Sequence, residues 1–198
     1  MSVCWRTKPY GSSEKNFGKG GRDSSGNDTV RFTSDKPNGE MIDEHVFDAI
    51  IGNIMRPKAL LDTNILVAGL SSQSGASFAL LGNALQGRFE LLASPALWLE
   101  YEAVLKRPSI VALHQLASST VDDVLNALAG RVTPVQSHYL WRPQLRDPKD
   151  EMVLEAAING QASHLVTLNV RDFIPAASHW RIELISPGSF LNLLETLP

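Results

Sequence analysis

The sequence predicts an α/β fold in which a central parallel β-sheet is covered by helices on both faces. The first observation is alternation: short apolar segments typical of buried strands recur along the chain, and segments with helical spacing of apolar residues separate them. The second is the placement of acidic residues, several of which directly follow these strands or begin these helices. Because parallel sheets carry their chemistry beyond the carboxyl ends of the strands, the sequence predicts a site at that edge.

The composition is that of an ordinary globular protein, with 43% hydrophobic residues and a formal net charge of −3 over 198 residues. No stretch approaches the roughly 18 apolar residues of a membrane span, and the opening segment lacks the apolar core of a secretory signal. We therefore expect a cytoplasmic protein that does not contact a membrane. A single cysteine excludes an internal disulfide, and five isolated histidines lack zinc spacing, so thiolate or imidazole metal chemistry is not expected.

The first part of the chain, residues 1–54, differs in composition from the remainder and is interpreted as an N-terminal extension. Residues 1 to about 40 are rich in Gly, Ser, Asn, Asp and Lys, and such a segment buries too little apolar surface to offset its ordering entropy, so we expect disorder. In residues 41–54, apolar residues recur at helical spacing. This segment could be a helix that docks on the domain, on a second copy or on another protein, or it could simply precede a domain formed by residues 55–198.

The elements of the domain follow from apolar patterning and from capping signals. A strand is predicted at 59–61, a loop at 71–76, a helix at 77–85 and a strand at 89–93. Ser94 and Pro95 then suit the cap and the first position of a helix that extends to about Lys106 and is stopped by Pro108. The remaining predicted elements are helices at 110–117 and 121–129 (capped by Thr120), a weak strand at 132–135, a helix from Asp147-Pro148 to about 158, strands at 164–168 and 182–185, and a helix at 190–194.

Asp62 is the first candidate for a functional residue. It ends the apolar run 59–61 and is followed by Thr63 and Asn64, two small hydrogen-bonding residues. An aspartate in this place can direct its carboxylate into a cleft at the end of the sheet. The alternative is that Asp62 begins a turn or caps a helix, which is the commoner role of a lone aspartate. Three further acids in comparable places favour the functional interpretation.

The helix predicted from Ser94 offers two acids, Glu100 and Glu102. Glu100 borders the apolar face of the helix, because apolar residues lie one turn to either side of it. Glu102 has Lys106 four residues later, in the favourable order for an exposed ion pair. Glu100 is therefore the predicted site residue, and Glu102 is expected at the surface.

The helix predicted after Asp147 provides the third acid, Asp150. Asp147 suits the cap position and Asp150 the third helical position, a pair that could simply satisfy free backbone amides. Asp150 also leads the apolar stripe of this helix, and that places its carboxylate at the rim of the sheet. Glu151 and Glu155 point elsewhere and are expected to be solvated.

Asp172 is the fourth acid, three residues beyond Asn169 and close to the end of a buried strand, where helix capping is an equally good explanation. Four carboxylates on one rim need a countercharge, because two of them 4 Å apart at an effective dielectric of 20 repel by about 4 kcal/mol. Mg²⁺ or Mn²⁺, hard cations that prefer oxygen ligands, are the natural partners. Such a cation generates hydroxide from water and neutralises charge on a phosphodiester. The predicted chemistry is metal-assisted phosphodiester hydrolysis.

Three segments give the chain a resemblance to a known family: LLDTNILVAGL, SPALWLEYEAVLKRP and RDPKDEMVLEAAINGQASHLVTLNVRDF. Over about residues 56 to 190 the chain resembles the PIN-domain ribonucleases, in particular the VapC-like toxin components of bacterial toxin–antitoxin modules. The resemblance implies a three-layer α/β/α sandwich and the Mg²⁺- or Mn²⁺-dependent cleavage of an RNA substrate. It also implies a protein antitoxin as partner and a homodimer.

Residue by residue, the resemblance assigns the catalytic and metal-binding roles to Asp62, Glu100, Asp150 and Asp172. Asp147 would lie nearby, and Thr63, Asn64, Thr167 and Asn169 would line the pocket in supporting roles. Some family members have an acid where this chain has Asn169, so Asp172 must serve here as the fourth acid. Residues 1–54 have no counterpart in the family pattern.

Arg146, Lys149 and Arg171 adjoin the proposed ligands in sequence and are placed to contact RNA phosphates. They could equally be ordinary surface charges.

Two other functions are compatible with parts of the pattern. A haloacid-dehalogenase-type phosphatase also begins with a strand that ends in Asp, but its chemistry needs a second acid two residues later, where this chain has Asn64. The second alternative is a non-catalytic PIN-like binding module. The presence of all four acids argues against a decayed site.

Overall fold

The computed structural model describes residues 56–197, so the predicted N-terminal extension and its helix at 41–54 lie outside the described residues. In the described part, a five-stranded sheet has the order β3-β2-β1-β4-β5. All neighbouring strands are parallel, as the alternation of strands and helices predicts. The strands are β1 (Lys58–Leu61), β2 (Glu90–Ala93), β3 (Val132–Pro134), β4 (His164–Val166) and β5 (Glu183–Ile185).

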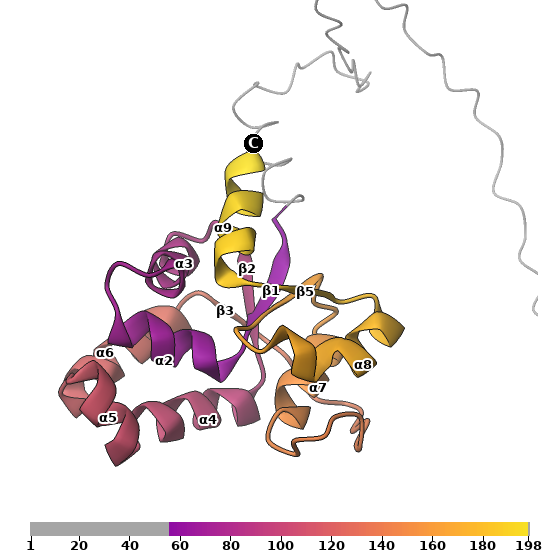
Figure 1. The fold of residues 1–198 in the computed structure, drawn as a ribbon, viewed down its shortest axis with the longest axis horizontal. Helices are drawn as coiled ribbons and strands as arrows, with labels where there is room; N and C mark the ends of the chain where they lie inside the picture. The colour runs from indigo at the N-terminus through magenta and orange to yellow at the C-terminus, as the bar shows by residue number, and fades with distance from the viewer. Residues whose placement is uncertain (1–55, 198) are drawn as a thin grey trace, which may run out of the picture. The chain divides into compact units, whose positions relative to one another are not determined.

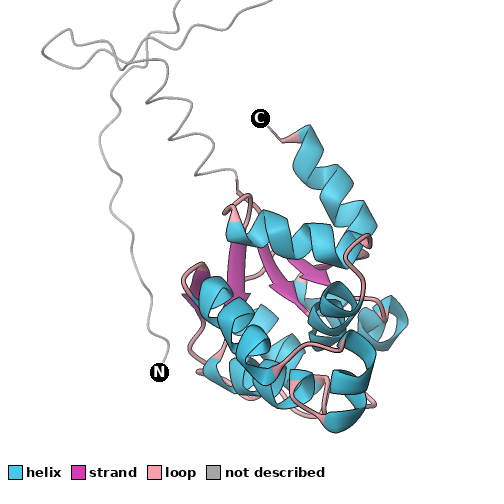
Figure 2. Ribbon diagram, turned by 90° about the vertical axis from the view of Figure 1, so that its left-hand side faces the viewer, coloured by secondary structure: helices cyan, strands magenta, loops and turns pink. Residues whose placement is uncertain are grey.

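Helices cover both faces of this sheet, which gives three layers (Figures 1 and 2). On one face, α2 (Thr63–Ser71) packs against α3 (Ala76–Leu85), and α3 packs against α9 (Pro187–Thr196). On the other face, α7 (Glu151–Asn159) contacts β1 and β2, and α8 (Val170–Trp180) contacts β5. The connection from β2 to β3 consists of α4 (Pro95–Leu105), α5 (Pro108–His114) and α6 (Ser118–Ala129).

The core lies on both sides of the central strands. Leu60 and Leu61 of β1 and Leu165 of β4 are at most 1% exposed. A strand that is buried on both faces reads as a continuous apolar run, which is why these strands are recognisable in the sequence. At Gly69 in α2, a β-carbon would lie 2.7 Å from a side-chain carbon of Leu81 in α3, so the glycine permits the close approach of these two helices.

Several predicted boundaries and elements differ from the structure. Residues 63–71, for which no element was predicted between the strand at 59–61 and the loop from 71, form helix α2, which begins directly after Asp62. The strand predicted at 164–168 ends at Val166, and Leu168 is 51% exposed. Pro108 was predicted only to end a helix, but it is also the first residue of α5, a position at which proline is favoured. α6 begins at Ser118 after Ala117, so Thr120 is not its cap.

Two further differences concern the second half of the chain. Asp147-Pro148 does not open a helix: Asp150 N–H donates to the Asp147 carbonyl in a turn, and α7 begins only at Glu151. α8 is absent from the predicted elements, because the proline at position 175 argues in sequence against a helix interior. The cap at Ser94 is confirmed, since its hydroxyl accepts a hydrogen bond from Leu97 N–H at 3.2 Å.

Within residues 56–197, no single helix combines the length and hydropathy of a membrane span; α2 and α3 reach them only jointly, as a pair bent by 106°.

Candidate active site

Asp62 lies at the carboxyl end of β1, the central strand, and is 5% exposed. Its backbone N–H donates to the Val166 carbonyl of the neighbouring strand β4 at 2.9 Å. Its side-chain oxygen Oδ2 accepts two hydrogen bonds, from Thr167 Oγ1 at 2.6 Å and from Asn64 Nδ2 at 2.6 Å. The carboxylate is thus fixed by groups from the ends of two adjacent parallel strands.

The two donors are themselves held in place. Asn64 Nδ2 also reaches Thr167 Oγ1 at 3.2 Å, and Asn64 Oδ1 accepts from Leu168 N–H at 3.2 Å. Thr167 Oγ1 accepts in addition from Asn169 N–H at 2.9 Å. The predicted supporting residues therefore form one network around Asp62, except that Asn169 takes part through its backbone. Thr63, the first residue of α2, is half-buried beside them.

Tyr101 belongs to the same region and was not among the predicted site residues. It is 1% exposed, and its hydroxyl donates to the carbonyl of Leu61, the residue before Asp62. This contact holds α4 across the carboxyl end of the sheet. In the sequence Tyr101 is only one apolar position of a helix, so no local pattern distinguishes it. Glu100, its neighbour in α4, is half-buried.

Three other aspartates act electrostatically on Asp150 at this end of the sheet. The pKa of Asp150 is raised to about 6, first by burial and then by the negative charges of Asp62, Asp147 and Asp172. Burial also raises the pKa of Asp62, against the opposing effect of the Thr167 hydrogen bond. Asp62, Asp147 and Asp172 therefore lie near enough to Asp150 for their charges to act on it, and we refer to these four residues as the acidic cluster; Glu100 is not among the acids that act on Asp150.

The donor set of this cluster fits a hard divalent cation in its chemistry. All its ligand atoms would be carboxylate, amide and hydroxyl oxygens, the types that Mg²⁺ and Mn²⁺ prefer, and the repulsion among the acids calls for positive charge. Charges act over longer distances than metal–ligand bonds do. Among the described residues, no three carboxylate, imidazole or thiol groups lie close enough together to bind one ion. The cluster therefore has the composition and charge that such a cation prefers, but its side chains do not form a closed ligand shell.

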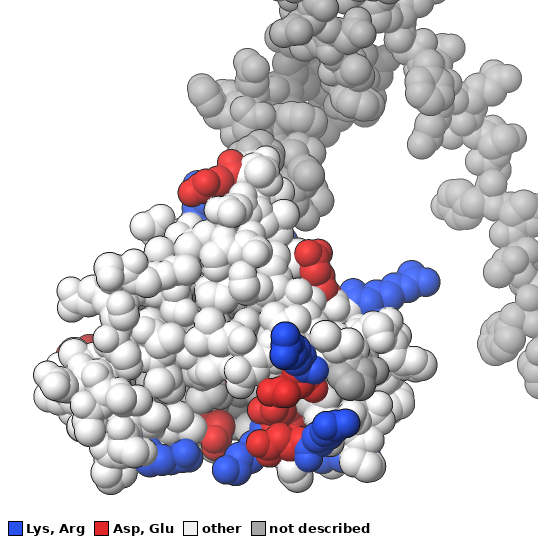
Figure 3. Space-filling model, viewed as in Figure 1, with Lys and Arg blue, Asp and Glu red and all other residues white. Residues whose placement is uncertain are grey.

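Basic residues border the acidic cluster. Arg146, Lys149 and Arg171 are exposed, and in the described part of the chain none of them forms a salt bridge. The backbone N–H of Lys149 donates to Asp147 Oδ1 at 2.9 Å, which fixes the turn that carries both charges. Figure 3 shows acidic and basic side chains side by side at the edge of the fold below the strands.

The expectation that Glu151 and Glu155 are solvated was wrong. They are 2% and 3% exposed, because the loop that precedes α7 folds back along this helix. Glu151 Oε1 accepts from the backbone N–H groups of Gln144 and Leu145 at 2.6 and 2.8 Å. Glu155 forms a two-point pair with Arg142, whose Nε and Nη2 lie 3.0 and 2.9 Å from its oxygens. Their partners come from a loop without periodicity, so the sequence gives no sign of them.

The surface Glu102, by contrast, pairs with Lys106 as predicted, and Lys106 also contacts Asp122.

A cavity of about 370 Å³ lies elsewhere, at the amino ends of β4 and β5. It is lined by residues that include Ala162, Trp180 and Ile182. Because the acidic cluster is at the carboxyl ends of the strands, this cavity is separate from the candidate active site.

Comparison with known proteins identifies the fold family. A family model described as PIN domain matches residues 58–171. Among solved structures, the chain is similar to one described as the crystal structure of VapBC2 from Rickettsia felis bound to a DNA fragment from their promoter, with 13% sequence identity and a TM-score of 0.47, over 65% of this chain and 98% of that chain. The comparison with curated proteins gives no match. Since the matched residues 58–171 make up more than half of the sequence and include Asp62, Asp150 and the strands that position them, the chain belongs to the PIN-domain family.

Proposed function

We propose that this protein is an endoribonuclease that depends on Mg²⁺ or Mn²⁺ and acts as the toxin of a toxin–antitoxin pair. PIN domains are generally nucleases that use divalent cations. The observation that carries the proposal for this chain is the cluster at the carboxyl end of the sheet. There Asp62 is buried and fixed by Thr167 and Asn64, and two further acids of the family pattern, Asp150 and Asp172, act on the same region.

Asp62, Asp150 and Asp172 would hold the cation, with Glu100 approaching from α4 and Asp147 contributing charge from the turn before α7. When bound, the cation would activate water as a nucleophile and neutralise charge on the phosphodiester. Thr167 and Asn64 orient Asp62, because they donate to the oxygen Oδ2 and leave Oδ1 free of these two donors. A fixed carboxylate needs no reorganisation when it is used, which is the advantage of a preorganised site.

Arg146, Lys149 and Arg171 are the proposed phosphate contacts. Their exposure leaves them accessible to a polyanion, and their position beside the acidic cluster would guide the RNA backbone to it. The negative field of the acids would otherwise repel RNA, so a bordering row of cations supports the proposal.

The proposed partners are an RNA substrate, a protein antitoxin and a second copy of the chain, in the cytoplasm. These proposals rest on the resemblance of the sequence motifs to toxin components.

The experiment that tests the function is incubation of the full chain with total cellular RNA. We expect cleavage with Mn²⁺ or Mg²⁺, no cleavage in excess chelator, and no cleavage by the Asp62→Asn variant, with cut sites mapped by sequencing of the RNA ends. RNA that is bound but never cut in the presence of metal would instead indicate a binding module. Cleavage that is unchanged by Asp62→Asn would contradict the proposed site.

A further inference from the structure

One side of α7 holds the loop that precedes it. Glu151, Glu155 and Asn159 are spaced one helical turn apart and therefore lie in a row along the helix. Glu151 accepts from the backbone of residues 144 and 145, Glu155 pairs with Arg142, and Asn159 binds the backbone at Tyr139. The loop from 138 to 145 is thus attached to α7 at each turn, and it runs antiparallel to the helix.

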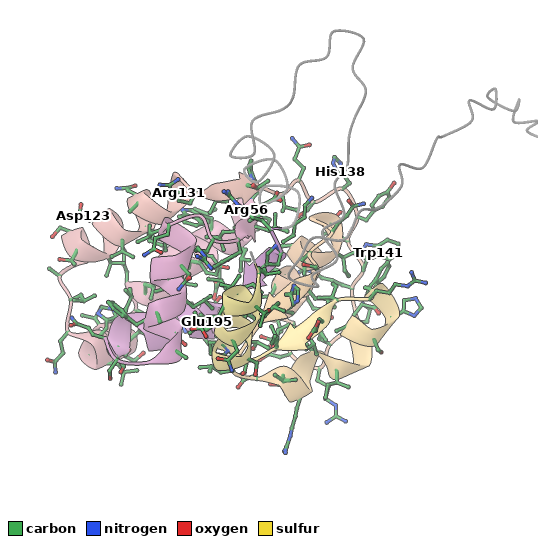
Figure 4. All side chains as sticks on the ribbon, turned by 90° about the horizontal axis from the view of Figure 1, so that it is seen from above. Arg56, Asp123, Arg131, His138, Trp141 and Glu195 are labelled. Atoms are coloured by element: carbon green, nitrogen blue, oxygen red, sulfur yellow. The ribbon has the colours of Figure 1, made fainter. Side chains whose placement is uncertain are left out.

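The attached loop exposes apolar side chains. Tyr139 is 65% exposed, Leu140 74% and Trp141 37%. The Tyr139 and Trp141 rings lie 5.8 Å apart, and Trp141 packs on Trp180, at the end of α8, with ring centroids 4.7 Å apart. Figure 4 shows Trp141 at the periphery of the fold. Fixed aromatic rings that remain in water are typical of a surface that binds another molecule, because their burial is deferred to the complex.

The aromatic strip, defined as Tyr139 to Trp141, lies along α7, and the acidic cluster is at the amino end of the same helix. Asp150 precedes the first residue of α7, whereas Asn159, which holds Tyr139, is its last residue. At a rise of about 1.5 Å per residue, the strip begins about 13 Å from the acids and runs back toward them. The same loop continues past Leu145 into Arg146 and Asp147. The strip and the candidate active site are therefore two parts of one continuous surface.

We propose that the aromatic strip binds single-stranded RNA by base stacking, a few nucleotides away from the bond that is cut. This proposal rests on the proposed ribonuclease function and adds a binding subsite to it. Stacking on tyrosine and tryptophan, combined with arginines that meet the backbone, is how single strands are bound without sequence preference. Here the exposed Arg146 follows the aromatic residues along the chain, whereas Arg142 is paired with Glu155.

The chemistry of the surface favours RNA over a protein as the occupant. The strip presents the rings of Tyr139 and Trp141, on which nucleic-acid bases stack, and the exposed Leu140 lies between them in the chain. The exposed cation Arg146 follows the strip in the chain, and the strip leads to the groups that would cleave a phosphodiester. These features are complementary to an extended polyanion with planar bases.

Tyr139 is the best probe of the strip. The hydrogen bonds of Asn159 go to its backbone, so a change of its ring leaves the loop attached to α7. Three variants of the full chain separate the contributions: Tyr139→Ala removes the ring, Tyr139→Phe keeps it, and Leu140→Ser removes apolar surface without removing a ring. Binding is measured by fluorescence anisotropy with a labelled single-stranded RNA of roughly 12 nucleotides in metal-free buffer, where cleavage does not interfere.

We expect Tyr139→Ala to raise the Kd about tenfold, without a change in its salt dependence, because stacking involves no counterion release. Tyr139→Phe and Leu140→Ser should bind like the parent chain. The inference is overturned if Tyr139→Ala binds normally, if Leu140→Ser weakens binding equally, or if the parent chain does not bind the RNA. RNA that is bound through Tyr139 but never cut with Mn²⁺ would refute the proposed function and leave this inference standing.

Discussion

Thr167 Oγ1 donates to Asp62 Oδ2 at 2.6 Å, although the two residues are 105 positions apart in the chain. They meet because β1 and β4 are parallel neighbours and each residue follows the last residue of its strand. This buried hydrogen bond fixes the carboxylate on which the proposed chemistry depends.

The first prediction tests the role of this hydrogen bond. Thr167→Val keeps the volume and shape of the side chain but removes the donor to Asp62. We expect a loss of about 1–3 kcal/mol in the free energy of unfolding, because a buried polar group loses its partner, together with a marked loss of RNA cleavage. Thr167→Ser, which keeps the hydroxyl, is the matched control and should retain most of the cleavage activity. Equal cleavage by the valine and serine variants would show that the hydroxyl does not position Asp62.

The second prediction concerns Asp150 in the absence of metal. Its folded-state pKa of about 6 lies above the ordinary value of 3.8, so the folded chain binds this proton more tightly than the unfolded chain does. Its contribution to stability is therefore fully present below pH 3.8 and is lost as the pH rises through about 6. Asp150→Asn does not titrate and should be more stable than the parent at pH 8 in chelator, by less than about 1 kcal/mol because solvent screens a partly exposed group.

Urea unfolding of both proteins at pH 5 and pH 8 measures this difference. The advantage of Asp150→Asn over the parent should be larger at pH 8 than at pH 5. A variant that is less stable than the parent at both values would contradict the electrostatic destabilisation of ionised Asp150; Asp150→Ala, unlike Asp150→Asn, also removes any capping side chain.

The third prediction concerns the pair that attaches the loop to α7. Arg142→Met leaves the buried Glu155 carboxylate without its two-point partner, and we expect a loss of about 1–3 kcal/mol in the free energy of unfolding. The double variant Arg142→Met/Glu155→Gln should lose less free energy of unfolding than the sum of the two single variants, because it contains no unpaired buried charge. Additive losses in urea unfolding would mean that the pair contributes little.

The fourth prediction concerns the basic residues. Replacement of Arg146, Lys149 and Arg171 by Ala should weaken the binding of single-stranded RNA and reduce the slope of log K against log salt by about 2, since each phosphate contact contributes about 0.7. Affinity for Mn²⁺ should remain nearly constant, because none of the three is a proposed ligand. An unchanged slope in binding measurements between low and high salt would place the RNA elsewhere on the surface.

The sheet and the position of Asp62 were predictable because both depend on local patterns. Strands that are buried on both faces appear as uninterrupted apolar runs, and a polar residue that ends such a run must lie at the edge of the sheet. The role of Thr167 beside Asp62 was implied by the resemblance to the PIN-domain family, and the parallel pairing of β1 and β4 explains why the two residues meet.

Other features depend on contacts that no local pattern encodes. Tyr101 reaches the Leu61 carbonyl across a helix–strand junction, and in sequence it is one apolar position among several. Glu151 and Glu155 look solvated on a helical wheel, but a loop without periodicity covers them. The exposed side chains of Tyr139, Leu140 and Trp141 form a defined surface only because this loop is attached to α7.

The fifth and most direct test of the account is the effect of Mn²⁺ on the melting temperature of the full chain. If the acidic cluster binds the cation in the folded state, Mn²⁺ at 100 times its Kd should stabilise the parent by about 2.7 kcal/mol, and the melting temperature should rise accordingly. Asp62→Asn, which removes one ligand at almost constant volume, should show little or no rise. A melting temperature of the parent that does not respond to millimolar Mn²⁺, or an equal rise in Asp62→Asn, would contradict the assignment of a metal site to the carboxyl end of the sheet.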